Sequence, residues 1–172
     1  KQNKSKQKIF DSLIKFENIS LPLLEKEYQK IHTFINISNE SAHSQFFSSN
    51  NQFKKILFEI GRGCLHNCNF CVSGHTKKPA RFLKIQKLLD SIYYFQQKGF
   101  EDFGFISATP TDYPQLEILL DYLNQNDLKY SFSSIRLDRI CEQLLMGLKK
   151  SNQKSITIAP EGASQKIRDI LN

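Results

Sequence analysis

Residues 55–71 read KILFEIGRGCLHNCNFC, an apolar run that passes directly into a loop with three cysteines. The run KILFEIG is rich in residues that favour β-structure and ends at Gly61, which predicts a buried strand. Cys64, Cys68 and Cys71 follow with the spacing C-x3-C-x2-C at the carboxyl end of that strand. An odd number of thiols in one short loop cannot all pair as disulfides, which favours a metal site.

The chain after this loop alternates between apolar runs and helical periodicity. Further strands are expected at 102–108, 129–135 and 155–159. Helices are expected near 85–96, 116–123, 141–148 and 164–171. Strands that each lead into a helix form parallel β–α units. The sequence therefore predicts an α/β fold, either an open doubly wound sheet or part of a barrel, with its chemistry at the carboxyl ends of the strands.

The first fifty residues differ in composition from the rest. Residues 1–50 are polar and rich in Asn and Ser at both edges, and a helical pattern runs between them from Pro22 to Ile35. We expect an N-terminal extension over 1–50 and a core domain over 51–172. Because the sequence starts at Lys1 and ends within an amphipathic stretch, we also expect a fragment of a longer protein.

Composition and charge narrow the function classes. The 172 residues, 40% of them hydrophobic, suffice for one globular unit. No apolar run is long enough for a membrane span and no signal peptide precedes the core, so we expect a cytoplasmic protein. The net charge of +7 is concentrated in residues 51–100, which hold nine basic and two acidic side chains. This favours an anionic cofactor, substrate or nucleic acid near the cysteines, or else a solvated Lys-rich face.

Two kinds of metal centre suit three thiols. A structural zinc site usually has four protein ligands, and His75 would complete a Cys3His set. An iron–sulfur cluster held by only three cysteines leaves one iron open to a cofactor or substrate. Gly61 and Gly63 would let the backbone pass closely around such a cluster.

The cysteine loop resembles the signature of the radical S-adenosylmethionine (SAM) superfamily, in which an aromatic residue, here Phe70, precedes the last cysteine. FEIGRGCLHNCNFC is similar to the opening of the Elongator catalytic subunit/MiaB/NifB-like group, especially its members with an upstream cobalamin-binding domain. SSIRLD (133–138) and SITIAPEGAS (155–164) are similar to later strands of that group, so the resemblance covers roughly residues 43–172. It implies a partial (β/α)6 TIM-like barrel, of which about four β/α units are present.

The same resemblance implies cofactors and an activity. Cys64, Cys68 and Cys71 would hold a [4Fe–4S] cluster whose fourth iron binds SAM, and flavodoxin or ferredoxin would supply the electron. Reductive cleavage of SAM would produce a 5′-deoxyadenosyl radical that abstracts hydrogen from a substrate. The substrate is not identified, and any cobalamin would bind through a domain outside this chain.

The resemblance also implies residues that contact SAM. These are Phe70, Ser107, Thr109, Ser134, Arg136 and Glu161. The segment ISATPTDYP, which contains Ser107 and Thr109, replaces a Gly-Gly-Glu motif that binds the SAM amine in many members. Arg136 suits a bidentate grip on a carboxylate.

Structural roles are the alternative for each of these positions. The ISATPTDYP segment would be a turn with Asp112 near a helix cap. Arg136 would pair with Asp138 on the surface, and Glu161 would interact with a helix dipole. Asp138 is expected to cap the following helix, and Cys141 to lie in the core as a small hydrophobic residue.

Two other functions stay open at this stage. A radical SAM enzyme that modifies RNA, of the methylthiotransferase type, is favoured by the basic charge around the cysteines. A zinc-stabilised interaction module without catalytic activity would use His75 as its fourth ligand.

Overall fold

The computed structural model describes residues 5–16, 19, 42–44 and 55–171. The chain divides into two compact units, Lys1–Ile35 and Asn36–Asn172. The first unit contains helix α1 (Lys6–Leu13), and the Ser5 hydroxyl accepts a hydrogen bond from the Lys8 N–H at the start of this helix.

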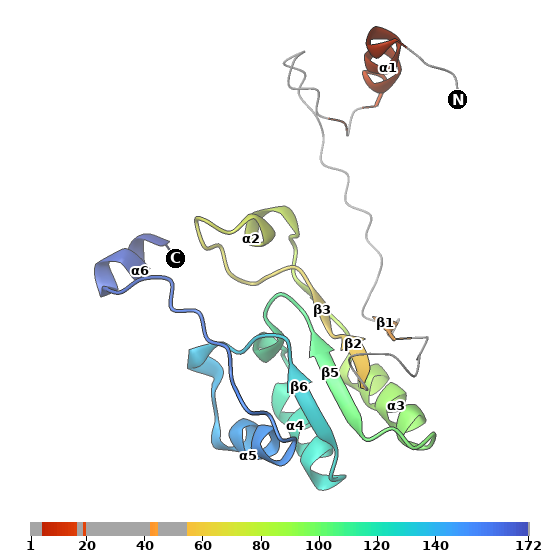
Figure 1. Ribbon diagram of the computed structural model, residues 1–172, viewed down its shortest axis with the longest axis vertical. Helices are drawn as coiled ribbons and strands as arrows, with labels where there is room; N and C mark the ends of the chain where they lie inside the picture. Colours follow the sequence, from red (N-terminus) through yellow and green to blue (C-terminus); the bar gives the residue numbers. More distant parts are fainter. Residues whose placement is uncertain (1–4, 17–18, 20–41, 45–54, 172) are drawn as a thin grey trace. The chain divides into compact units, whose positions relative to one another are not determined.

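The second unit is built around three parallel strands, β2 (Ile56–Glu59), β5 (Asp102–Ile106) and β6 (Lys129–Phe132). The order in the sheet is β1–β2–β5–β6, and the short strand β1 (Ala42–His43) runs antiparallel along the edge of β2. Figure 1 shows β5 between its two parallel neighbours. These three strands confirm the predictions from the apolar runs that begin at residues 55, 102 and 129.

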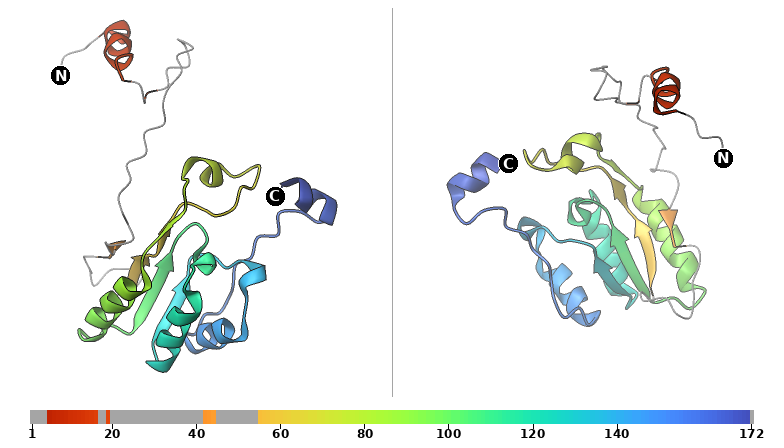
Figure 2. Two further views of the ribbon diagram at one scale, coloured as in Figure 1. Left: turned by 180° about the vertical axis from the view of Figure 1, so that it is seen from behind. Right: turned by 45° about the horizontal axis from the view of Figure 1, so that its top comes forward.

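Helices follow the parallel strands and cover one face of the sheet. Helix α3 (Ile85–Gln96) precedes β5, α4 (Leu116–Gln125) connects β5 to β6, and α5 (Glu142–Lys150) follows β6. The left view of Figure 2 shows these helices in front of the sheet. The α/β fold class expected from the sequence is therefore confirmed.

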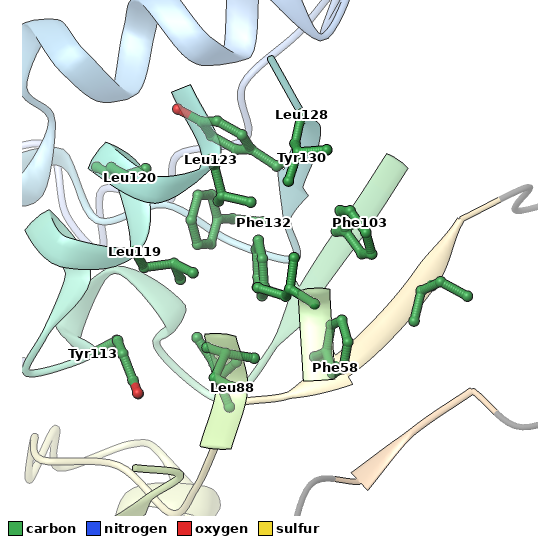
Figure 3. Close-up of a cluster of buried hydrophobic side chains, with 14 of the residues drawn as sticks. Phe58, Leu88, Phe103, Tyr113, Leu119, Leu120, Leu123, Leu128, Tyr130 and Phe132 are labelled. Atoms are coloured by element: carbon green, nitrogen blue, oxygen red, sulfur yellow. The ribbon is translucent and has the colours of Figure 1, made fainter. Parts of the chain in front are cut away.

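The core lies between the sheet and these helices. Phe58 of β2 and Phe105 of β5 are fully buried, and their rings stack at a centroid distance of 6.3 Å. Figure 3 shows the strand aromatics facing leucines from α3 and α4. Each such buried side chain contributes about 1.5–3 kcal/mol through the hydrophobic effect, so this layer supplies much of the rigidity of the strands.

The opposite face of the sheet carries charged, hydroxyl and glycine residues beside Leu57. The Lys55 ammonium donates a hydrogen bond to the Ser131 hydroxyl at 2.9 Å and pairs with the Asp102 carboxylate at 3.3 Å. A Cβ on Gly104 would lie 2.4 Å from the Leu57 side chain, so Lys55, Leu57, Gly104 and Ser131 share this face. The arrangement matches the inner face of an open barrel.

The prediction of a strand at 155–159 is wrong. This segment forms no strand, and it leads instead through a loop to helix α6 (Gln165–Leu171). Ile156 packs against the core, but Ile158 is 46% exposed. An alternation of apolar residues and hydroxyls is typical of strands, yet here Ile156 is only partly buried and Ile158 is exposed.

Two expectations about the start of the third predicted helix are also wrong. Cys141 occupies the N-cap position of α5 and is exposed, because the buried side of α5 is formed by residues further along, including Leu144 and Leu148. Asp138 lies in a 3₁₀ turn, Leu137–Arg139, where its carboxylate binds Arg136 instead of capping α5.

Some expectations fall on other parts of the chain. The helix predicted from Pro22 to Ile35 lies outside the described residues. The second Asn- and Ser-rich edge of residues 1–50 contains the two-residue strand β1, which the sequence does not predict. Over the part of the chain that the structure describes, no helix has the length and apolar character needed to cross a membrane.

Candidate functional site

The three cysteines lie in a loop that is closed at its base by a short antiparallel ladder. Strand β3 (Gly61–Arg62) pairs with β4 (Arg81–Phe82), and the intervening residues include the short helix α2 (Val72–Thr76). Figure 1 shows this loop beyond the carboxyl ends of the parallel strands. We refer to residues 63–80 as the cysteine loop.

Two glycines let the cysteine loop pack against itself. Gly63 has a φ of +83°, and a Cβ at this position would lie 2.2 Å from the carbonyl oxygen of Lys77. A Cβ on Gly74 would lie 2.8 Å from the carbonyl oxygen of His66. Contacts this close to backbone atoms exclude a side chain, so the two glycines fix how the loop folds back.

An ion pair holds the start of the loop to the sheet. The Arg62 guanidinium donates two hydrogen bonds to the carboxylate of Glu59, the last residue of β2, at 2.7 Å each. These bonds to Glu59 raise the pKa of Arg62 above its ordinary value. Bidentate pairing of this kind also fixes the direction in which the chain leaves the strand.

The cysteines are free and partly buried. A turn joins Cys68 and Cys71, because the Cys71 N–H donates to the Cys68 carbonyl at 2.9 Å. The His66 N–H points at the Cys64 sulfur at 3.4 Å. Phe70, between the second and third cysteines, is exposed. Within the described ranges, no three His, Cys, Asp or Glu side chains are gathered closely enough to hold a metal ion as they stand.

His75, the candidate fourth zinc ligand, faces a backbone atom. Its Nε2 lies 3.0 Å from the carbonyl oxygen of Cys68. The contact ties α2 to the centre of the cysteine loop through one of the two ring nitrogens, and it leaves Nδ1 as the nitrogen that a metal would bind.

A buried carboxylate lies under the cysteine loop. Asp112 belongs to a buried 3₁₀ turn, Pro110–Asp112, that follows β5, and its side chain is 1% exposed. Its Oδ2 lies 2.7 Å from Nε2 of His66, and its Oδ1 accepts a hydrogen bond from Nε of Arg139 at 3.2 Å. One carboxylate thus connects the loops that follow β2, β5 and β6.

Arg136 lies in the turn after β6, with its Nε 3.8 Å from Oδ1 of Asp112. It binds the Asp138 carboxylate through Nε at 3.0 Å and Nη2 at 2.8 Å, which is the surface ion pair. Its pKa is raised, first by this hydrogen bond and then by the negative charges of Asp138 and Asp112.

The other predicted SAM contacts occupy different surroundings. Ser107 follows β5, and its hydroxyl oxygen is buried without a hydrogen-bond partner among the described residues. Thr109 is partly buried in the same turn, whereas Ser134 is exposed after β6. Glu161 is exposed before α6, and no ion pair or hydrogen bond joins it to the cysteine loop in the described part of the chain.

The cysteine loop also contacts α6. The Asn69 side-chain amide donates to the carbonyl of Ile170 at 2.8 Å, and the Asn69 N–H donates to the carbonyl of Leu171 at 2.9 Å. Both views of Figure 2 show the end of α6 beside the loop.

Sequence reasoning missed Asp112, Arg139 and Asn69 as parts of this site. Asp112 gave one signal, since it is an acidic residue in the otherwise uncharged segment ISATPTDYP. That signal was interpreted as a helix cap. The contacts of Asp112 with His66 and Arg139 join residues that lie 46 and 27 positions apart, which no local pattern can indicate.

The chain is similar to a known protein and to a protein family. An uncharacterized protein of Methanocaldococcus jannaschii is 32% identical over 123 residues, which cover 69% of this chain and 26% of that protein. The chain thus spans about a quarter of the length of this relative. No solved structure matches the chain. Residues 58–172 match the Radical SAM superfamily, and the chain therefore belongs to that superfamily.

Proposed function

We propose that this chain holds a [4Fe–4S] cluster on Cys64, Cys68 and Cys71 and cleaves SAM reductively. The observation that carries the proposal is the position of three free thiols in one loop at the carboxyl end of β2, within a superfamily domain. When bound, the cluster supplies one electron to the sulfonium of SAM, and cleavage yields methionine and the 5′-deoxyadenosyl radical that removes hydrogen from the substrate.

The donor set fits a cluster with one open iron. Iron–sulfur clusters are held by cysteine thiolates and tuned by hydrogen bonds to sulfur, and the His66 N–H is directed at the sulfur of Cys64. The three thiols belong to one short stretch, 64–71, so a cluster would require only this part of the loop to adjust. His75 binds a backbone carbonyl through Nε2, and we assign the cluster to the three thiols alone.

The remaining SAM contacts are proposed from the same end of the sheet. The Ser107 hydroxyl is buried without a described partner, so a ligand amine or hydroxyl would satisfy it. Arg136 lies in the turn after β6, 3.8 Å from the buried Asp112 carboxylate, and would bind the SAM carboxylate. Phe70 would cover the cofactor from the loop. We keep Thr109, Ser134 and Glu161 as further SAM contacts on the strength of the family resemblance.

Metal analysis of single variants tests the proposal. The full chain is reconstituted with iron and sulfide under anaerobic conditions and should bind about four irons, with broad visible absorption. Replacement of Cys64, Cys68 or Cys71 by Ser should remove most of this iron. Cys141→Ser is the matched control, because this thiol is exposed at the start of α5 and should leave the iron content unchanged.

Two further measurements separate this function from a zinc module. Dithionite and SAM added to the reconstituted protein should yield 5′-deoxyadenosine and methionine. His75→Ala should keep its iron, because His75 is not a proposed ligand. A colourless protein with one tightly bound zinc, lost in His75→Ala, would contradict the radical SAM activity.

A further inference from the structure

Asp112 has an environment that the proposed cofactor ligands do not explain. Its carboxylate is almost fully buried, and burial of a charge costs several kcal/mol unless partners compensate it. The partners come from different loops. His66 belongs to the cysteine loop, whereas Arg136 and Arg139 belong to the turn after β6.

The two carboxylate oxygens are divided between these loops. Oδ2 faces Nε2 of His66 at 2.7 Å, while Oδ1 faces Nε of Arg139 at 3.2 Å and Nε of Arg136 at 3.8 Å. A carboxylate only accepts hydrogen bonds, so Nε2 of His66 is the donor in this contact. His66 lies between two of the proposed cluster ligands, and its own N–H points at the sulfur of Cys64.

The turn that carries Asp112 is itself held on two sides. The Tyr113 hydroxyl donates to the carbonyl of Leu83, just before α3, at 2.6 Å. The Thr111 hydroxyl accepts the backbone N–H of Arg136 at 3.1 Å. These two hydrogen bonds fix the position of the turn that carries Asp112. The imidazole that Asp112 binds belongs to a loop with exposed residues such as Leu65 and Val72.

We propose that Asp112 is a positioning residue that holds the cysteine loop in its folded arrangement through His66. This inference rests on the proposed function, because the loop that Asp112 holds is the loop that would carry the cluster. Partners of a metal ligand outside the coordination sphere commonly change metal affinity or activity by about 10–100-fold when they are removed. Asp112 does not bind the peptide unit beside a ligand directly. It binds the side chain of His66, two residues after Cys64.

Variants of similar size at Asp112 and His66 test this. Asp112→Asn leaves one oxygen to accept from Arg139 and turns an NH2 group toward Nε2 of His66, so the hydrogen bond donated by His66 is lost and a contact returns only if the imidazole changes its tautomer. His66 and Arg139 are 26% and 56% exposed, so water can hydrate them once they are released. His66→Phe removes the donor, whereas His66→Gln keeps an N–H that can reach the carboxylate.

The readout is the rate at which each cysteine of the full metal-free chain is alkylated by iodoacetamide, mapped by peptide mass spectrometry. We expect Asp112→Asn and His66→Phe to raise the rates at Cys64 and Cys68 about threefold or more, and His66→Gln to stay near wild type. Cys141 is the internal reference, because it is exposed far along the sequence at the start of α5. Asp138→Asn is the control variant, since Asp138 binds Arg136 but not His66.

Iron retention gives a second, separate measurement. After reconstitution, Asp112→Asn should lose iron to a chelator about tenfold faster than wild type, with a changed electron paramagnetic resonance spectrum in the reduced state. Loop alkylation rates equal to wild type in Asp112→Asn and in His66→Phe would overturn the proposal. An equal rise at Cys141 would also overturn it, because that would indicate general loosening.

The two proposals fail in different ways. If the wild-type chain binds no cluster, the proposed function fails, yet alkylation of the metal-free chain still decides the role of Asp112. If Asp112→Asn does not fold, as judged by its circular dichroism spectrum, the comparison of His66→Phe with His66→Gln decides it instead.

Discussion

The side-chain amide of Asn69 donates a hydrogen bond to the carbonyl oxygen of Ile170 at 2.8 Å, which joins the cysteine loop to the last turn of α6. The final carbonyls of a helix have no partner within the helix, so a donor from elsewhere stabilises its end. Since α6 contains no buried residue, this contact is important for its position.

Replacement of Asn69 by Ala should therefore loosen α6. Loss of one exposed hydrogen bond costs about 1 kcal/mol, which corresponds to roughly fivefold faster amide exchange in residues 165–171. Hydrogen–deuterium exchange followed by mass spectrometry measures this directly. Asn67→Ala is the control, because the Asn67 side chain binds Lys78 within the loop. Equal exchange of α6 in both variants would show that Asn69 does not hold the helix.

Gly63→Ala should destabilise the chain more than Gly99→Ala. Both glycines have positive φ, of +83° and +84°, and a left-handed conformation costs an alanine about 1 kcal/mol. Only Gly63 also faces a backbone atom, since its Cβ would lie 2.2 Å from the Lys77 carbonyl, whereas nothing lies within 4 Å of a Cβ on Gly99. Urea unfolding should show a loss of at least about 2 kcal/mol for Gly63→Ala and about 1 kcal/mol for Gly99→Ala. Similar losses for the two variants would mean that the loop shifts freely at Gly63.

Gly147→Ala tests how closely α5 approaches the sheet. Alanine normally stabilises a helix relative to glycine by about 1 kcal/mol. Here the new Cβ would lie 1.8 Å from the Tyr130 hydroxyl oxygen and 2.4 Å from the ring carbon that carries it. We expect a net loss of about 1–3 kcal/mol in the free energy of unfolding. Tyr130→Phe in the same chain should recover part of this loss, whereas a gain in stability for Gly147→Ala alone would contradict the close approach.

The elements that the sequence predicted correctly are those whose signals are local. Phe58, Phe105 and Phe132 lie in apolar runs that form the three parallel strands, and they are buried in the core. The period of apolar residues in 85–96 likewise matches the bounds of α3. Burial of one face leaves a repeating pattern in the sequence, so strands and helices with a buried face can be recognised.

The features that the sequence did not predict depend on contacts between distant segments. The hydroxyl and apolar alternation in 155–159 suggested a strand, but pairing also requires that the segment lie along a free strand edge with its apolar residues covered. Cys141 fitted the period of α5, yet the helix begins one residue later and leaves the thiol exposed. Asp112 is central to the site because three loops meet around it, and neither its neighbours nor its spacing indicate those partners.

The stability of the fold should fall as the pH rises from about 10 to about 12. Burial raises the pKa of Tyr113 to about 12, and burial likewise raises the pKa of Tyr130 to about 12. A tyrosine in the unfolded chain loses its proton near pH 10, so between these values the unfolded state binds fewer protons and is favoured. The stabilisation is complete below about pH 10 and is lost as the pH passes the pKa of the folded state.

Tyr113→Phe separates this effect from the general effect of alkali. The variant loses the hydrogen bond from the Tyr113 hydroxyl to the Leu83 carbonyl, which should cost about 1 kcal/mol at pH 8. It has one buried phenol fewer to keep protonated, so its free energy of unfolding should decline less steeply between pH 10 and pH 12 than that of wild type. Urea titrations of both chains at pH 8, 10 and 11 measure the difference between their free energies of unfolding. This difference should become smaller as the pH rises. A constant difference would mean that the Tyr113 hydroxyl ionises as readily in the folded chain as in the unfolded one, which its burial beside Leu83 argues against.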